Sequence, residues 1–217
     1  MTSLALFDLD GTILDTLKDL ALSVNYSLSS ENLPSRTTDE IRTFLGNGIR
    51  VLINLSVPEN TSKEQTERVF QTFVKYYGEH CVDNTCPFEG IPELFMALRK
   101  EGVKIAIVSN KADFAAQKLC KQFFPDMYDF AIGAKDGIAK KPSRDMIDEA
   151  LASFPEIEEK DCVYIGDSEV DVETARNAKM REIAVLWGFR SLEELKKSGA
   201  VDFAADTKEL LQKILNK

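Results

Sequence analysis

The sequence predicts an α/β fold in which a parallel sheet is flanked by helices and interrupted once by an all-helical insertion. Three observations support this. The apolar run Leu4–Phe7 is typical of a strand that is buried on both faces. From residue 104 onward, short apolar runs alternate with amphipathic segments, as strand–helix units do. Between these two regions, apolar residues recur only with helical spacing.

The first strand runs directly into Asp8-Leu9-Asp10-Gly11-Thr12. Ligands of open α/β sheets bind at the carboxyl ends of the strands, so two carboxylates at this point are candidates for chemistry. One can attack an electrophile while the other transfers protons to and from the leaving group. A calcium-binding loop would continue with further acidic positions, whereas Ile13 and Leu14 follow here.

The next segment, residues 15–82, shows no strand pattern. The apolar residues of its first part recur as on one face of a helix and are Leu17, Leu20, Ala21, Val24 and Leu28. Later apolar groups continue with the same period. The sequence therefore predicts a helical cap of residues 15–82 on a core formed by residues 1–14 and 83–217.

The remaining strands and helices alternate along the rest of the core. Further strands are expected at residues 104–109, 130–134, 162–167, 183–187 and 202–204. Helices are expected at residues 113–123, 143–153 and 169–178. This alternation places helices on both faces of the sheet.

Two of these strands also end in polar residues. Ser109-Asn110-Lys111 offers a hydroxyl and an amide that can bind phosphoryl oxygens, although either residue would also cap the following helix. Gly166-Asp167-Ser168 is followed by Asp171, and hard oxygen ligands at a strand end suit Mg²⁺. The alternative for these acidic residues is again helix capping, favoured by the helix dipole.

Lys140-Lys141-Pro142 supplies positive charge before another expected helix. By itself, a pair of lysines before a helix is more often a solvated basic spot on the surface. The aspartates at the strand ends would repel one another if they converged, since unpaired buried charges are costly. Convergence therefore requires a divalent cation and a lysine.

The composition limits the partners. The 217 residues carry a formal net charge of −9, and nucleic acids and anionic membranes attract clustered Lys and Arg instead. Neither a signal peptide nor an apolar run of about 18 residues is present, and the cysteines lack zinc-site spacing, so a cytoplasmic protein with reduced thiols is expected. No pattern predicts an oligomeric state.

The chain thus carries four motifs, in the order Asp8–Thr12, Ser109–Lys111, Lys141-Pro142 and Gly166–Asp171, with the helical insertion after the first. They resemble the motifs of the haloacid dehalogenase superfamily, in its phosphatase branch with a helical cap. The resemblance implies a Rossmann-like core and an Mg²⁺-dependent phosphatase that acts on a small phosphorylated metabolite through an aspartyl-phosphate. It implies that Asp8 is the nucleophile, that Asp10 is the acid and base, and that Lys141 stabilises charge. The family pattern places the catalytic lysine directly before proline, which selects Lys141 over Lys140.

The resemblance also implies binding roles. The residues expected to hold phosphoryl oxygens are Thr12, Ser109, Asn110 and Lys141. The metal ligands would be Asp8, the backbone carbonyl of Asp10, and Asp167, with Asp171 orienting metal-bound water.

Several segments, among them Phe44–Arg50 and Pro87–Gly90, look most like phosphoglycolate phosphatases. This implies a substrate-selecting cap loop at Gly46-Asn47-Gly48 whose backbone amides approach the ligand, with Arg50 meeting a substrate carboxylate. A helix–helix turn with a surface arginine is the alternative. Phosphoglycolate is the best single candidate substrate.

Other functions of the same fold stay open. These are a sugar phosphomutase or phosphotransferase, a pyrophosphatase or nucleotidase, and a non-catalytic protein that binds a phosphorylated ligand. A mutase usually carries a cap histidine soon after the first motif, but the only histidine is His80, at the far end of the insertion. A non-catalytic protein would have lost a catalytic carboxylate or the lysine, and all are present.

Overall fold

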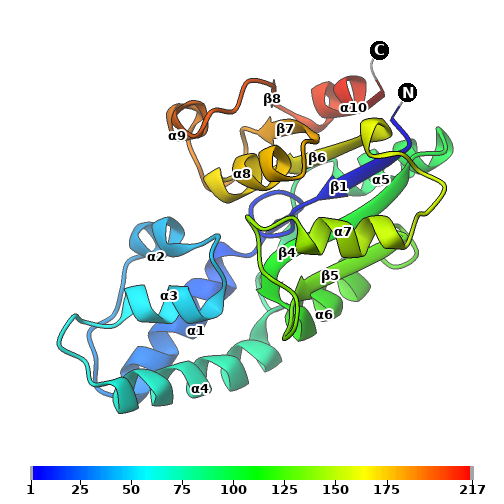
Figure 1. Cartoon of the computed structure of the whole chain (residues 1–217). Coiled ribbons are helices and arrows are strands. Elements are labelled where there is room, and N and C mark those ends of the chain that lie inside the picture. The colour runs from blue at the N-terminus through cyan, green and yellow to red at the C-terminus, as the bar shows by residue number, and fades with distance from the viewer. Residues whose placement is uncertain (1, 216–217) are drawn as a thin grey trace.

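The computed structural model describes residues 2–215, and its centre is a six-stranded sheet (Figure 1). In spatial order the strands are β5 (Phe130–Ala134), β4 (Lys104–Ala112), β1 (Leu4–Phe7), β6 (Cys162–Gly166), β7 (Arg181–Val185) and β8 (Phe203–Ala204). All neighbours run parallel. Because β1 lies between β4 and β6, the carboxyl ends of these three strands meet at one edge, where the sequence places its polar motifs.

Helices cover both faces of this sheet. One face carries α5 (Ile91–Lys100), α6 (Asp113–Phe123) and α10 (Thr207–Leu215), and the other carries α7 (Asp145–Ala152), α8 (Glu169–Asn177) and α9 (Leu192–Ser198). A short 3-10 helix, Glu159–Asp161, leads into β6. Phe7 packs with α5 and α6, whereas its neighbour Leu6 packs with α7 and α8. Burial on both faces explains why β1 is continuously apolar.

The insertion is helical, as the sequence predicts. Its helices are α1 (Leu17–Ser30), α2 (Thr38–Phe44), α3 (Ile49–Ser56) and α4 (Lys63–His80). α1 packs along α4, while α2 and α3 complete the bundle. Figure 1 shows this bundle beyond the edge of the sheet at which β1 ends. These helices and the loops between them, residues 17–80, are called the cap below.

The two chain crossings between core and cap lie side by side. β2 (Leu14–Asp15) pairs antiparallel with β3 (Cys86–Pro87). The buried carboxylate of Asp19 accepts hydrogen bonds from the backbone N–H groups of Asn84 at 2.9 Å and Thr85 at 2.8 Å, which ties the second crossing to α1. Sequence patterns did not predict this pair of strands, because strands of two residues have no measurable periodicity.

One strand near the end of the chain has different bounds from those predicted. The strand expected at residues 183–187 is β7, which begins at Arg181 and ends at Val185. The next residue, Leu186, still donates its backbone N–H to the carbonyl of Ala204 at 3.0 Å, whereas the indole N–H of Trp187 donates to the backbone carbonyl of Thr12 at 3.0 Å. Trp187 therefore supports the first motif rather than the strand. None of the described helices is long and apolar enough to cross a membrane.

Candidate active site

The parallel strands bring the four motifs together. Asp8 follows β1, the Ser109–Lys111 segment lies at the end of β4, and Asp167 follows β6. Because Phe7 pairs with Ile107 on one side and with Ile165 on the other, the polar residues after these three positions lie at the same level of the sheet. Lys141 reaches the same edge from the loop that follows β5.

Lys141 is at the centre of the charged groups. Its buried ammonium group donates to Asp8 Oδ1 at 2.6 Å, to Asp171 Oδ1 at 2.8 Å and to the Tyr164 hydroxyl at 2.9 Å. Burial alone would lower the pKa of Lys141, but Asp171 and Asp8 raise it well above its ordinary value. The lysine is therefore held in its charged form between two carboxylates. This geometry distinguishes it from Lys140, whose side chain extends toward Gly48 of the cap instead.

Asp8 and Asp167 are buried close to further carboxylates, which raises the pKa of both. Burial is the main reason that the pKa of Asp8 is raised to about 6, with Lys141 opposing and Asp171 adding to the increase. Burial also raises the pKa of Asp167 well above its ordinary value, and the charges of Asp171 and Asp8 add to it. Within residues 2–215, Asp167 accepts hydrogen bonds from two neutral groups, the hydroxyl of Thr12 at 3.1 Å and the backbone N–H of Phe189 at 2.7 Å.

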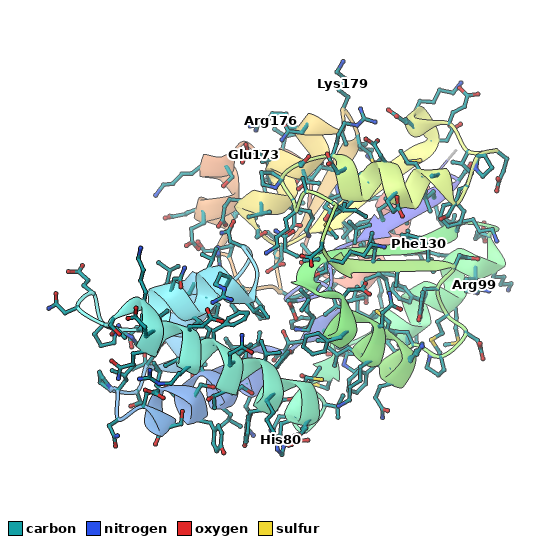
Figure 2. All side chains as sticks on the ribbon, turned by 60° about the horizontal axis from the view of Figure 1, so that its bottom comes forward. His80, Arg99, Phe130, Glu173, Arg176 and Lys179 are labelled. Atoms are coloured by element: carbon teal, nitrogen blue, oxygen red, sulfur yellow. The ribbon has the colours of Figure 1, made fainter. Side chains whose placement is uncertain are left out.

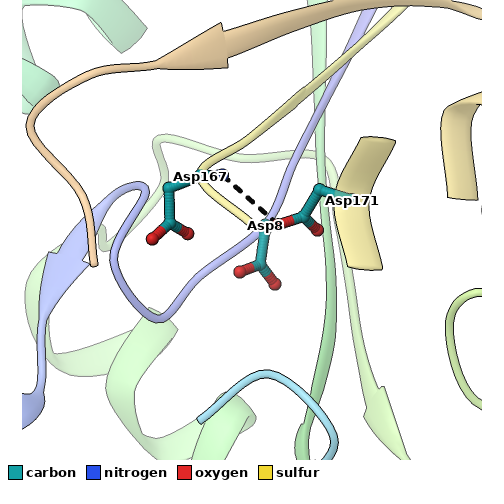
Figure 3. A group of neighbouring side chains, drawn as sticks. All are labelled: Asp8, Asp167 and Asp171. Atoms are coloured by element: carbon teal, nitrogen blue, oxygen red, sulfur yellow. Dashed lines mark hydrogen bonds between the residues drawn. The ribbon is translucent and has the colours of Figure 1, made fainter. Parts of the chain in front are cut away.

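This donor set fits a divalent cation. Asp8, Asp167 and Asp171 each offer a carboxylate oxygen, and these oxygens lie within 4.8 Å of one another (Figure 3). Carboxylates are the ligands that Mg²⁺ prefers, and a cation would relieve the repulsion at Asp167. Gly11 permits the close approach of the first motif: it has a φ of +87°, and a Cβ at this position would lie 2.3 Å from Asp167 Oδ2.

The hydrogen bonds of Asp171 give it a supporting position. Its Oδ1 accepts from Lys141 and from the Tyr164 hydroxyl at 3.1 Å. Its Oδ2 accepts from the Ser168 hydroxyl at 2.6 Å and from the backbone N–H groups of Ser168 and Asp167 at 3.1 and 3.3 Å. This carboxylate therefore caps α8, as the alternative interpretation expects, and it also fixes Lys141, a contact that the sequence analysis did not predict. Because both oxygens are occupied, Asp8 and Asp167 are better placed than Asp171 to bind a metal directly.

Asp10 is held by two groups. Its Oδ1 accepts from the Thr16 hydroxyl at 2.6 Å, and the ammonium group of Lys111 lies 2.9 Å from Oδ1 and 3.2 Å from Oδ2. Asp10 retains partial exposure, with 21% of its side chain accessible, whereas Lys111 is buried. Lys111 belongs to the second motif, but the sequence analysis assigned it no role.

Asn110 connects the cap, the second motif and the third. Its side-chain Nδ2 donates to the carbonyls of Gly46 and Lys141, both at 2.9 Å, and its Oδ1 accepts from the backbone N–H of Lys141 at 2.8 Å. A phosphoryl oxygen would have to replace one of these bonds to bind the carboxamide. The neighbouring Ser109 lines the cavity beside Asp8, and its expected role in binding phosphoryl oxygens stays a prediction.

A small cavity of about 40 Å³ lies between the cap and the sheet edge. Polar groups line its floor, namely Asp8, Asp10, Ser109, Asn110 and Lys111. The cap wall is apolar or glycine and consists of Leu20, Leu45, Gly46, Gly48, Ile49 and Leu52. Both glycines of the expected cap loop thus line this cavity, while Asn47 is not among the lining residues.

Arg50 lies elsewhere. Its guanidinium pairs with Glu67 at 2.5 Å, lies 3.3 Å from the centroid of the Phe70 ring, and faces a separate hollow of the cap. The structure does not bring Arg50 to Asp8 and Asp10, and this arrangement favours the alternative of a surface arginine.

The sequence profile of the haloacid dehalogenase-like hydrolases matches residues 5–185. The chain belongs to the haloacid dehalogenase-like hydrolase family. A phosphoglycolate phosphatase of Aquifex aeolicus is 31% identical over 188 residues, which cover 86% of each chain. One of Agrobacterium fabrum is 30% identical over all of this chain and 96% of the relative. The crystal structure of a candidate phosphoglycolate phosphatase from Lactobacillus delbrueckii subsp. bulgaricus is 39% identical, covers both chains fully, and superposes with a TM-score of 0.92.

In this haloacid dehalogenase-like hydrolase, Arg190 joins the cap to the core. Its guanidinium donates to the backbone carbonyls of Leu45 at 2.8 Å and Arg42 at 3.1 Å, and it pairs with Glu169 of α8 at 2.8 Å. Arg42 donates in return to the carbonyl of Phe189 at 3.3 Å. These contacts hold the loop that covers the catalytic cavity, and no sequence pattern predicted them.

Replacing Arg190 by Gln should loosen this loop. Charge-assisted hydrogen bonds contribute about 1.5–3 kcal/mol each, so amide hydrogen exchange at residues 42–46 should become at least about tenfold faster. Arg50→Gln is the matched control, because Arg50 pairs only within the cap through Glu67. Equal exchange of these residues in both variants would show that Arg190 does not hold the loop.

Proposed function

We propose that this chain is a divalent-cation-dependent phosphatase that hydrolyses a small phosphate monoester through an aspartyl-phosphate on Asp8. One observation carries the proposal: the buried carboxylate of Asp8 is held by Lys141 and faces the same cavity as a second carboxylate, Asp10. This arrangement supports a reaction in which a nucleophile and a proton-transfer group act on the same phosphoryl group.

In the first step, Asp8 attacks phosphorus and the bond to the leaving oxygen breaks. Asp10 donates a proton to that oxygen, so that an alcohol departs. In the second step, Asp10 accepts a proton from a water molecule that attacks the same phosphorus, which releases inorganic phosphate and restores Asp8. Lys141 offsets the negative charge of Asp8 and of the phosphoryl group in both steps.

Asp8 and Asp167 would hold the divalent cation together with the backbone carbonyl of Asp10. We propose Mg²⁺, because it takes one or two carboxylates and keeps several waters. When bound, it supplies charge stabilisation for the phosphoryl oxygens. The phosphoryl contact expected of Ser109 completes the proposed site, whereas the Thr12 hydroxyl, for which the same role was expected, donates to Asp167.

The cap supports a small substrate. The cavity of about 40 Å³ under an apolar cap wall would have to open for any phosphate ester, and a small ester needs the least displacement of the cap. The relatives described above carry the name phosphoglycolate phosphatase, so 2-phosphoglycolate is our first candidate. A sugar phosphomutase is less well supported, because the single histidine, His80, lies at the end of α4 and pairs with Asp83, away from this cavity (Figure 2).

We also propose a cytoplasmic location and no nucleic-acid partner. All four cysteines are free thiols, which is typical of a reducing compartment. The net charge of −9 disfavours a phosphate backbone as ligand.

The test is release of inorganic phosphate from 2-phosphoglycolate, pyrophosphate, hexose phosphates and nucleotides, with Mg²⁺ and with a chelator. We expect release that requires the cation and is fastest for 2-phosphoglycolate. Interconversion of sugar phosphate isomers without phosphate release would support the mutase instead. Binding of these compounds without turnover would contradict the enzymatic proposal.

A further inference from the structure

Lys111 occupies an unusual position for a lysine. Its side chain is only 1% exposed, it lines the floor of the catalytic cavity, and its ammonium group contacts both oxygens of Asp10. Burial alone would lower the pKa of this lysine, but the charge of Asp10 raises it beyond its ordinary range. A charged lysine that is removed from water in this way requires a fixed partner, and that partner is Asp10.

The two contacts of Asp10 differ in what they fix. The Thr16 hydroxyl binds Oδ1 alone, at 2.6 Å. Lys111 binds the two oxygens together, at 2.9 and 3.2 Å, and so restricts rotation of the carboxylate plane. Since Asp10 is 21% exposed, loss of Lys111 would leave its carboxylate held only through Oδ1, by Thr16, and less restricted from turning toward solvent.

The cap supports Lys111 in turn. The ring of Tyr77, a buried residue of α4, lies with its centroid 4.7 Å from the ammonium group. This distance is within the range of a cation–π interaction. Asp10 of the first motif is thus connected through Lys111 of the second motif to a cap helix.

We propose that Lys111 is a positioning residue that holds Asp10 in the orientation for proton transfer to the leaving oxygen. The inference rests on the proposed function, and it adds a residue that acts through the acid and base rather than on phosphorus. It has a specific consequence. Loss of Lys111 should matter most for substrates whose leaving group needs a proton.

The test compares Lys111→Met with the wild type on two esters, 2-phosphoglycolate and p-nitrophenyl phosphate. The alkoxide of the first is a poor leaving group that requires protonation, whereas nitrophenolate departs without it. Because general acid catalysis contributes roughly 10²–10⁴-fold, kcat/KM for the alkyl ester should fall on the order of 10²-fold. For the aryl ester it should change by no more than about threefold, since kcat/KM reports only the steps through leaving-group departure.

Two further variants sharpen the test. Lys140→Met removes the same charge close to the cap loop without touching Asp10, and it should affect both esters alike. Lys111→Gln keeps a hydrogen-bond donor and tests the same selectivity should the methionine variant fail to fold. Equal losses on both esters, or no loss on either, would overturn the role of Lys111. Absence of wild-type activity on both esters would instead contradict the proposed function.

Discussion

Replacing Asp8 by Asn is expected to reduce phosphate release by at least about 10⁴-fold, because a carboxamide is not a competent nucleophile for covalent catalysis. The fold should remain intact. Asn has nearly the same shape, and the substitution removes one of the buried carboxylates that repel Asp167. Lys141 would keep its bond to Asp171. Initial rates of phosphate release and the thermal midpoint of unfolding measure the two effects separately.

Asp136→Asn is a suitable control, because it removes the same charge from an exposed loop position. We expect it to retain wild-type turnover. An Asp8→Asn protein with near-normal activity would refute the assignment of the nucleophile. An inactive but unfolded protein would be uninformative about chemistry, so the unfolding measurement accompanies every rate.

Replacing Lys141 by Met should impair both stability and turnover. The two carboxylates bound by this lysine, Asp8 and Asp171, would be left buried without their cation. Breaking a buried ion pair from one side costs about 3–5 kcal/mol of unfolding free energy. Loss of a preorganised charge at the reacting group costs roughly 10²–10³-fold in rate. Urea unfolding and initial rates are the measurements.

The pH dependence of this variant gives a second check. Protonation of the unpaired carboxylates relieves their repulsion, so the variant should lose less stability in acidic buffer than in alkaline buffer. Lys140→Met, at an exposed neighbouring position, should show neither the loss of stability nor its pH dependence. A Lys141→Met protein as stable as the wild type at every pH would contradict the charge arrangement described here.

The strand ends explain why the position of the candidate site could be predicted. Asp8, Ser109 and Asp167 each follow an apolar run that the sequence marks clearly, and parallel neighbours bring such ends together. At these residues the end of the apolar run in the sequence coincides with the end of the buried strand, so the sequence pattern also marks the edge of the sheet.

The connections between motifs could not be predicted, since they join residues distant in sequence. Lys111 and Asp10 are 101 residues apart, and Arg190 and Leu45 are 145 apart. No local period reports such contacts. The expected position of Arg50 failed for a different reason: successive helical residues point about 100° apart, so with Ile49 and Leu52 toward the cavity Arg50 turns toward Glu67.

The most direct test of the central claim is to identify the phosphorylated residue. The protein would be mixed with 2-phosphoglycolate and Mg²⁺, quenched in acid during turnover, digested, and examined by mass spectrometry. We predict one phosphoryl group on the peptide that contains Asp8, present only with the divalent cation and absent from Asp8→Asn. Phosphorylation of another residue would contradict the account, and so would full turnover in the Asp8→Asn protein.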